Sequence, residues 1–535
     1  MISAGAKQPL KRFDAAMLRG ATAHYLLDLT YAGRVFRLSR EVVEVPIAAT
    51  GEVLQYEGTL EGALTWEEAL TLFSSSGDVS SVSLACVLPV DVPALVAAGH
   101  DLLSATGELS MWIEGTDYED RRVLMRGRLA DPQYGGVDEP ISASLQAEWF
   151  EDSAIMPAPS QVVSATTWPA AAENAVGMSY PLVFGATAAS GAGATSMSRA
   201  YLVDTAAEYI LIAGHRVLAA TVTISVEGDL AAGTVITSTD ALGQVVSLVD
   251  LTGLPLTYDD ADDFMVSWTD GALAGDDGEV LTGAGDVLAY LLRLSSVPVD
   301  TGRVQAAKAY LNRFKLAGCV LEGVSPFEFI SANLSPILPM SMVLGPFGLY
   351  PVPWRFDAIL RDAVEHIDRE ADPTIDRDGP VQYETSIKDI VNEFKLRWAL
   401  RLRTGSTRGM SVLTGVRNED NPDEAESAYC YQSQARYGVK AMDVETTMVY
   451  DAATAGLVLA WWARAKSLPT RTITYVVGYD RAWLERGDPV AITDPELHMD
   501  QQMALVEQLT YREDGTIRLR LRIIEDVALT FKAAG

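Results

Sequence analysis

The feature of this sequence that most restricts its fold is an alternation of basic and apolar residues near the C-terminal end. Within Thr516–Ile523 every second residue is aliphatic, and three of the residues between them are arginines. Because side chains of a strand point alternately to its two faces, this segment predicts a strand with one apolar face and one arginine face. Asp514-Gly515 in front of it is typical of a hairpin turn and predicts pairing with residues 503–511. The arginines of this face are Arg518, Arg520 and Arg522.

A second segment, 393–403, repeats the pattern with its basic residues on one face and large apolar residues on the other. The chain as a whole is acidic, with 72 Asp and Glu against 41 Lys and Arg and a formal net charge of −31. Two almost wholly basic strand faces are therefore unexpected in this chain. The basic residues of the second face are Lys395, Arg397, Arg401 and Arg403.

Three interpretations of these basic faces are open. The arginines could pair with acidic neighbours across strands, each pair contributing about 0.2–1 kcal/mol. They could instead form a protein interface, where arginine binds carboxylates through two N–H groups at once. The third interpretation is nucleic-acid binding, which is disfavoured because the basic faces themselves carry no aromatic residues on which bases could stack.

Length and composition predict several folded domains. A chain of 535 residues is too long for one hydrophobic core, and 48% of its residues are hydrophobic. The acidic excess argues against wrapping nucleic acid, since phosphate binding needs positive potential. The three cysteines are far apart in the sequence, which indicates neither a disulfide framework nor a zinc site and fits a reducing compartment. We expect no signal peptide and no transmembrane segment.

The order of strand-like and helix-like segments predicts a multidomain, mainly β chain with α+β parts. Residues 1–160 form a β domain in this prediction, with short helices at 65–73 and 91–103. An inserted β domain, a small sandwich or barrel with a flexible loop, occupies residues 161–285. The remainder divides into a helix-rich α+β segment at 286–354 and a second β domain at 355–535, which contains a helix at 452–467.

Several helix starts are marked by capping residues. Asp300 or Thr301 is expected to cap one helix, and Asp451 another. Ser325 followed by Pro326 is expected to cap a third. Asp300-Thr301-Gly302 also matches the tripeptide of aspartic proteases, but its place at the start of a helix favours capping over catalysis.

An acidic segment at 259–279 contains eight carboxylates, and calcium needs six to eight oxygen ligands. Their order does not fit an EF-hand, so a solvated loop is the preferred interpretation. The five histidines are dispersed, and the sequence contains no phosphate-binding loop, nucleophile elbow or zinc-protease motif. We therefore predict no catalytic site, no metal site and no cofactor, although two carboxylates could still meet in space. The candidate residues of the acidic loop are Asp259, Asp260, Asp262, Asp263, Asp276 and Asp277.

The order of features in the C-terminal half resembles the baseplate hub or central tail-tip proteins of long-tailed bacteriophages and gene transfer agents. A pair of helices around 297–314 is followed by a helix at 325–334, a Gly-rich strand at 345–354 and the basic strand at 393–403. Gly487-Asp488, followed by alternating Val490 and Ile492, resembles the start of a late barrel strand in that family. The segment Tyr180–Gly185 is also similar to part of siphophage hub proteins. The resemblance covers residues 280–535 and, more loosely, the N-terminal half; the insert at 185–285 departs from it.

This resemblance implies a homotrimer in which two β-barrel-like hub domains per chain surround a channel at the distal end of the tail tube. The implied partners are a distal tail or tail tube protein, tail fibre or tail-tip proteins and the tape measure protein, with DNA only in transit and indirect contact with the host envelope. The implied location is the virion, after assembly in the host cytoplasm. Two alternatives remain open: a tail-associated cell-wall hydrolase that uses the acidic cluster, or a receptor-binding tail protein whose insert at 185–285 recognises the host.

Overall fold

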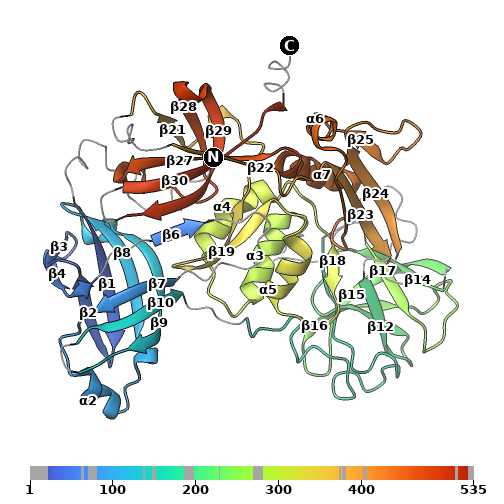
Figure 1. Ribbon diagram of the computed structural model, residues 1–535. Coiled ribbons are helices and arrows are strands. Elements are labelled where there is room, and N and C mark those ends of the chain that lie inside the picture. Colours follow the sequence, from blue (N-terminus) through green and yellow to red (C-terminus); the bar gives the residue numbers. More distant parts are fainter. Residues whose placement is uncertain are drawn as a thin grey trace.

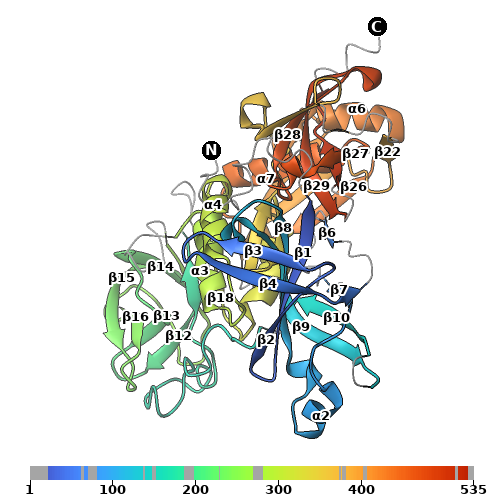
Figure 2. The same cartoon turned by 90° about the vertical axis from the view of Figure 1, so that its left-hand side faces the viewer.

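The computed structural model shows a mainly β protein of several domains, as the sequence predicts (Figure 1). In the view of Figure 1 a nine-stranded sheet lies at the lower left and a small closed barrel at the lower right. Helices lie between them and two further sheets lie above. Figure 2 shows the same arrangement from the side of the nine-stranded sheet. The structure describes residues 22–61, 66–69, 81–136, 139–147, 152–185, 198–227, 229–268, 281–372, 375, 381–401, 406–512 and 516–527.

The nine-stranded sheet has the strand order β3-β4-β2-β1-β8-β9-β10-β7-β5. A tight turn at Ala32 and Gly33, with φ of 50° and 74°, joins its first two strands, because a two-residue hairpin needs positive φ at both positions. A helix, α2 (Val92–Ala97), follows Asp91, whose carboxylate accepts a hydrogen bond from the Ala94 N–H. The strands are β1 (Ala23–Tyr31), β2 (Arg34–Ser39), β3 (Val43–Ile47), β4 (Glu52–Gly58), β5 (Leu60–Glu61), β7 (Ser81–Cys86), β8 (Thr106–Ile113), β9 (Arg122–Gln133) and β10 (Ile141–Ala147).

The helix predicted at 65–73 is wrong for the residues that the structure describes. Trp66–Ala69 forms a strand, β6, and the rest of the predicted helix lies outside the described residues. This strand does not join the nine-stranded sheet; it pairs with residues 508–511 near the other end of the chain. Local sequence favours a helix here, but pairing with a distant strand decides the conformation.

The inserted domain is a closed six-stranded barrel, which settles the predicted choice between sandwich and barrel. Its interior is filled by aliphatic side chains and Phe264. A two-stranded sheet pairs β11 (Leu182–Phe184), which precedes the barrel in the sequence, with β18 (Gly318–Val320), which follows it. Most of the predicted flexible loop at 185–197 lies outside the described residues. The barrel strands are β12 (Ser198–Asp204), β13 (Tyr209–Ala213), β14 (Thr221–Val226), β15 (Asp229–Thr239), β16 (Val245–Asp250) and β17 (Phe264–Ser267).

The helix-rich segment begins its helices where the sequence predicts. The Asp300 carboxylate accepts the Arg303 N–H at 3.1 Å, and the Ser325 hydroxyl accepts the Glu328 N–H at 3.2 Å. Asp300 is therefore a helix cap, as predicted. The elements of this segment are α3 (Ala284–Leu294), α4 (Thr301–Leu311), α5 (Pro326–Phe329) with a π-helical turn after it, β19 (Met340–Gly345) and β20 (Gly348–Pro353).

The C-terminal part contains two separate sheets, and each of them holds one of the two basic strands. A seven-stranded sheet has the order β21-β28-β29-β30-β27-β22, with β6 paired beside β29. The predicted pairing of 503–511 with 516–523 is confirmed. The strands are β21 (Glu365–Asp368), β22 (Gln382–Ser386), β27 (Thr470–Gly478), β28 (Pro489–Asp494), β29 (Met499–Tyr511) and β30 (Thr516–Ile523).

A four-stranded sheet and two helices complete the chain. Its strand order is β25-β24-β23-β26, and the helix predicted at 452–467 is present as α7 (Ala452–Lys466). The Asp451 carboxylate caps this helix by accepting the Thr454 N–H at 2.7 Å. The other elements are β23 (Glu393–Arg401), β24 (Ser406–Thr414), β25 (Glu424–Glu426), β26 (Ala441–Glu445) and α6 (Ala428–Tyr437).

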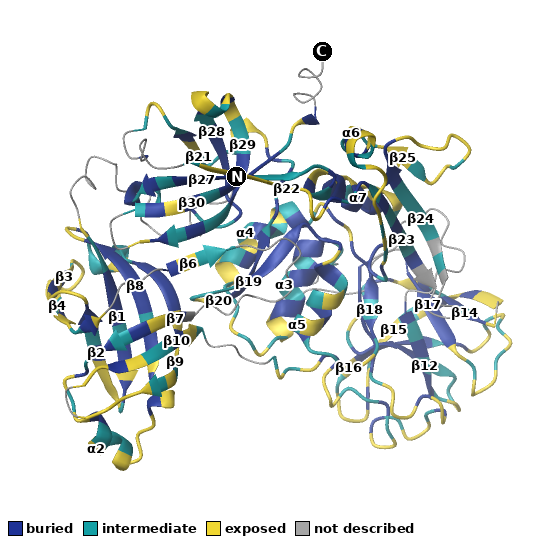
Figure 3. Cartoon of the chain, viewed as in Figure 1, coloured by how far each residue is buried: buried dark blue, intermediate teal, exposed yellow. Residues whose placement is uncertain are grey.

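One continuous hydrophobic core joins the nine-stranded and seven-stranded sheets. Leu27 and Leu109 of the first sheet belong to the same buried cluster as Tyr475 and Val506 of the second. Figure 3 shows buried residues in strands of both sheets, among them β8 and β29. No helix in the described part of the chain is long and apolar enough to cross a membrane.

His215 joins the barrel to β11 through both ring nitrogens. Its Nε2 accepts the Val183 N–H at 3.1 Å, and its Nδ1 donates to the Arg216 carbonyl at 3.0 Å. Burial lowers the pKa of His215 from 6.5 to about 4, although these backbone hydrogen bonds act in the opposite direction. The ring is therefore neutral in the folded protein at pH 7.

We predict that His215 makes the folded protein less stable as the pH falls from 6.5 towards 4. In this window the unfolded histidine takes up a proton and the folded one does not, at a cost of about 1.4 kcal/mol per pH unit. Between pH 7 and pH 5, wild type should lose about 2 kcal/mol more free energy of unfolding than His215→Gln, which cannot titrate. Urea unfolding at both pH values measures this; equal losses in the two proteins would contradict it.

Candidate functional site

The arginine face of β30 is only partly available at the surface. Arg518 is exposed. Arg520 Nε lies 3.1 Å from Glu507 Oε2, and its Nη2 lies 3.0 Å from Glu384 Oε2. Both of these carboxylates belong to the same sheet as Arg520, so this part of the face matches the cross-strand interpretation.

Arg522 differs from the other two arginines because the residue is only 8% exposed and is buried within the chain. It donates to the Ala465 carbonyl at 3.2 Å and to the Thr470 hydroxyl at 3.1 Å. Its guanidinium also lies 5.2 Å from the ring centre of Phe356. Arg522 therefore links the seven-stranded sheet to the end of α7.

The basic face of β23 pairs with the neighbouring strand β26. Lys395 Nζ and Arg397 Nη2 lie 3.7 Å and 2.8 Å from Asp443 Oδ2. The predicted alternation is interrupted at Ala399, which has φ of 56° and is buried against the barrel. The side chain of Arg401 and the whole of Arg403 lie outside the described residues.

The acidic loop is a surface turn in the part that the structure describes. Asp259, Asp260 and Asp263 are exposed, and Asp262 accepts the Asp259 N–H at 2.8 Å. Asp276 and Asp277 lie outside the described residues. Within the described ranges, no three His, Cys, Asp or Glu residues come close enough to hold a metal ion.

A group of charges lies where three parts of the chain meet, around Glu68 of β6. Its side chain is 12% exposed, and Arg122 Nη2 of the nine-stranded sheet lies 3.3 Å from its Oε2. Arg486, from the turn before β28, lies 3.8 Å from the same oxygen. The Trp66 indole donates to Oε1 at 3.3 Å. We refer to Glu68, Arg122, Arg486 and Arg303 as the junction cluster.

The ionisation of Glu68 is set by two opposing effects. Burial alone would raise its pKa, because a charged carboxylate is poorly solvated there. The positive charges of Arg122, Arg486 and Arg303 outweigh burial and lower the pKa below its usual value. Glu68 is therefore a carboxylate at neutral pH, and its charge stabilises the junction.

The arginines of the junction cluster also bind backbone and side chains of distant segments. Arg122 donates to the carbonyls of Ala482 and Leu484 in the C-terminal part. Arg486 donates to the Ala69 carbonyl at 3.0 Å. The N-terminal and C-terminal sheets are thus joined by hydrogen bonds as well as by a common core.

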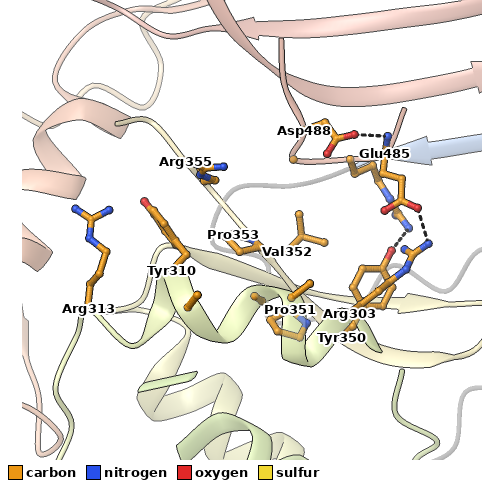
Figure 4. A pocket seen from close by; sticks show the side chains of 15 residues that line it. Arg303, Tyr310, Arg313, Tyr350, Pro351, Val352, Pro353, Arg355, Glu485 and Asp488 are labelled. Carbon is orange, nitrogen blue, oxygen red and sulfur yellow. Dashed lines mark hydrogen bonds and ion pairs between the residues drawn. The ribbon is translucent and has the colours of Figure 1, made fainter. Parts of the chain in front are cut away.

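A pocket of about 300 Å³ opens beside the junction cluster, between α4, β20 and the turn at 485–488 (Figure 4). In Figure 4 Arg313 and Arg355 lie near Tyr310 at one end, and Arg303, Glu485 and Tyr350 lie at the other. The wall between the two ends is apolar. It is formed by Ala306, Ala307, Ala309, Pro351, Val352 and Pro353.

The pocket is built from groups that already stabilise the fold. Arg303 Nη2 lies 2.9 Å from Glu485 Oε1, and Asp488 accepts the Glu485 N–H at 3.0 Å. At the other end the Tyr310 hydroxyl donates to Asp357 at 2.8 Å. Each carboxylate that lines the pocket therefore has a structural role, and the two do not form an isolated acid–base pair.

Gly487, which the sequence analysis singled out, lies in the wall of this pocket. Its φ is 81°, and a Cβ placed on it would lie 2.4 Å from Val352 Cγ1. Only glycine meets both constraints, because it tolerates positive φ and has no side chain to collide with β20. Gly487 and Asp488 thus allow the turn before β28 to pack closely against β20 of the helix-rich segment.

No protein-family model matches this chain, and no curated protein matches it. Among solved structures, a tail protein from Neisseria meningitidis aligns with 94% of this chain and 97% of its own, at 11% identity and a TM-score of 0.37. The 43 kDa tail protein of prophage MuSo2 from Shewanella oneidensis aligns with 94% and 98%, at 10% identity and a TM-score of 0.32. The virion of a gene transfer agent contains a chain that aligns with 69% of this one and 90% of its own, at 10% identity and a TM-score of 0.34. TM-scores of this size do not establish a common fold.

The junction cluster was missed by reasoning from the sequence. Its members lie at positions 68, 122, 303 and 486, and no local pattern connects them. The available signal was Trp66-Glu67-Glu68, in which an aromatic residue and a carboxylate share a face if the segment is a strand. The same letters fit a short helix equally well.

We predict that Glu68→Gln destabilises the protein by about 3 kcal/mol or more, because it leaves buried guanidinium groups without their carboxylate. Glu67→Gln, in the same strand but exposed, should change the free energy of unfolding by less than about 0.5 kcal/mol. Because the pKa of Glu68 is lowered in the folded state, its contribution is present above its unfolded pKa and disappears as the pH falls through the folded pKa. Denaturant unfolding of both variants at neutral pH tests this, and equal stability of the two variants would refute it.

Proposed function

We propose that this chain is a structural component of the tail of a long-tailed phage or related particle, where it forms a trimeric hub at the distal end of the tail tube. The observation that carries the proposal is the position of β6. This strand of the N-terminal region pairs with β29 and so becomes part of the C-terminal seven-stranded sheet. This strand and the junction cluster join the two largest sheets to each other. A hub must hold its β domains in fixed positions to join a tube to tip proteins.

The residues that resemble hub proteins support the same proposal. Gly487 and Asp488 form the turn that lets β28 start against the helix-rich segment. Tyr180–Gly185 contains β11, which pairs with β18 next to the barrel. Both segments lie where separate parts of the chain meet. Two of the solved structures reported above are named as tail proteins.

The charge of the chain suits a channel for DNA in transit. With a formal net charge of −31, a lumen formed by several copies would repel phosphates and let DNA slide without binding. The exposed Arg518 on β30 and the half-buried Lys395 and Arg397 on β23 would contact neighbouring subunits or tail proteins. These neighbours would include the distal tail or tube protein, the tape measure protein and fibre or tip proteins.

The proposed role is structural rather than enzymatic. The carboxylates that line the pocket are engaged in the ion pair with Arg303 and in the turn before β28. The described carboxylates of the acidic loop are mostly exposed and hydrogen-bond to their own backbone. Assembly in the host cytoplasm followed by location in the virion is part of the same proposal.

We predict that the purified full-length chain forms a trimer of about 173 kDa, from three chains of 57.6 kDa. Light scattering at low and high salt measures this mass. If oppositely charged surfaces meet between subunits, the trimer should weaken as salt is added, because salt screens exposed charges. A mass of one chain at every protein concentration would contradict the trimer in solution.

We also predict that the chain is found at one end of the tail in particles released from cells that carry its gene. Gold-labelled antibodies against the barrel, at residues 198–267, can locate it by electron microscopy. Deleting the gene should leave particles without complete tails. A cell-wall digest with the purified protein provides the opposite test: hydrolysis of glycan or peptide bonds would refute a purely structural role.

A further inference from the structure

A second cavity, of about 20 Å³, lies within the junction cluster, and we call it the junction cavity. All four members of the cluster line it, together with the first residues of β9, the end of β10 and the turn between β19 and β20. Figure 1 shows β6, which carries Glu68, between the two largest sheets. A water molecule needs about 10–15 Å³, so the junction cavity has room for one water molecule or one small ion.

Arginines dominate the wall of the junction cavity. Arg122, Arg126, Arg303 and Arg486 line it, and Glu68 is the one acidic residue among the described residues of the wall. This is the opposite of the chain as a whole, which carries a formal net charge of −31. The cavity wall therefore favours a negatively charged occupant over a positively charged one.

Two of these arginines have carboxylates that do not line the cavity. Arg126 Nη2 lies 2.6 Å from Glu108 Oε2. Arg303 lies 3.4 Å from Asp300 Oδ2 and 2.9 Å from Glu485 Oε1. Neither arginine therefore depends on the cavity for a counter-charge.

The other two arginines, Arg122 and Arg486, share the single carboxylate of Glu68. Their side chains are only 4% and 10% exposed, and the Nε–H group of each has no hydrogen-bond acceptor in the described part of the chain. Glu68 Oε2 lies 3.8 Å from Arg486 Nε, which is too far for a hydrogen bond. Buried donors are normally satisfied by protein, water or an ion, so these two groups call for an acceptor in the cavity.

We propose that the junction cavity binds a monatomic anion, chloride or a similar halide. The anion accepts hydrogen bonds from the Nε–H groups of Arg122 and Arg486 and adds the negative charge that Glu68 alone provides to both. A water molecule could accept the same bonds but carries no charge, and hydrogen bonds between charged groups are the stronger ones. Because Arg122 belongs to the nine-stranded sheet and Arg486 to the turn before β28, the ion links the N-terminal and C-terminal parts of the chain. This site goes beyond the role in the tail and does not depend on a trimer.

The first test is the melting temperature of wild type at fixed ionic strength, with chloride replacing methanesulfonate, an anion too large for the cavity. An ion that binds only the folded protein stabilises it in proportion to the logarithm of its concentration above the dissociation constant. For a chain of this length the melting temperature should rise by about 1 °C for each tenfold increase in chloride. A melting temperature that is the same in both anions would overturn the proposal.

The second test fills the cavity with Ala147→Leu, at the end of β10, and leaves every charge in place. The matched control is Ala143→Leu, in the same strand and likewise half-buried against the core, but outside the cavity wall. The dependence on chloride should disappear in Ala147→Leu and persist in Ala143→Leu. If Ala147→Leu keeps the full dependence, chloride acts elsewhere and the inference is wrong.

The third test needs no variant and applies even if Ala147→Leu does not fold. Crystals of the full chain soaked in bromide should give an anomalous scattering peak between Arg122 and Arg486. Density for a water molecule without an anomalous signal at that position would overturn the proposal. Neither result bears on whether the chain forms a trimer, which light scattering tests separately.

Discussion

The structure depends on keeping a charged carboxylate, Glu68, in a site from which water is largely excluded. Burial of an unpaired carboxylate costs several kcal/mol, so the site is stable only when its positive partners are present. Arg122 comes from the nine-stranded sheet, Arg486 from the turn before β28 and Arg303 from the helix-rich segment. None of these parts can leave the junction without exposing the others to an unbalanced charge. Glu68 and its three arginines therefore tie these parts of the chain together.

The arginine faces in an acidic chain have more than one explanation. Arg520 and Arg397 pair with carboxylates of neighbouring strands, as expected for a solvated sheet face. Arg522 instead links its strand to α7 and to aromatic side chains within the chain. Arg518 stays at the surface. One repeating sequence pattern thus provides a cross-strand pair, an internal link and a surface charge.

The pocket beside the junction illustrates how a structural feature can resemble a binding site. It combines tyrosines, arginines and carboxylates around an apolar wall, which is typical of ligand sites. Its charged groups, however, pair with other side chains or with the backbone, and Gly487 is required there by the close approach of β20. The same groups hold α4 and β20 against the turn at 485–488.

The sequence by itself determined the elements whose causes are local. Alternation predicts β30 and its hairpin with β29, and capping side chains mark the starts of α4, α5 and α7 at Asp300, Ser325 and Asp451. Only the tertiary structure decided that 66–69 is a strand, because its hydrogen-bond partners lie more than four hundred residues away in the chain. The junction cluster and the burial of Arg522 were decided in the same way. Local propensity acts over a few neighbours, whereas ion pairs and sheet edges depend on which distant segments the common core brings together.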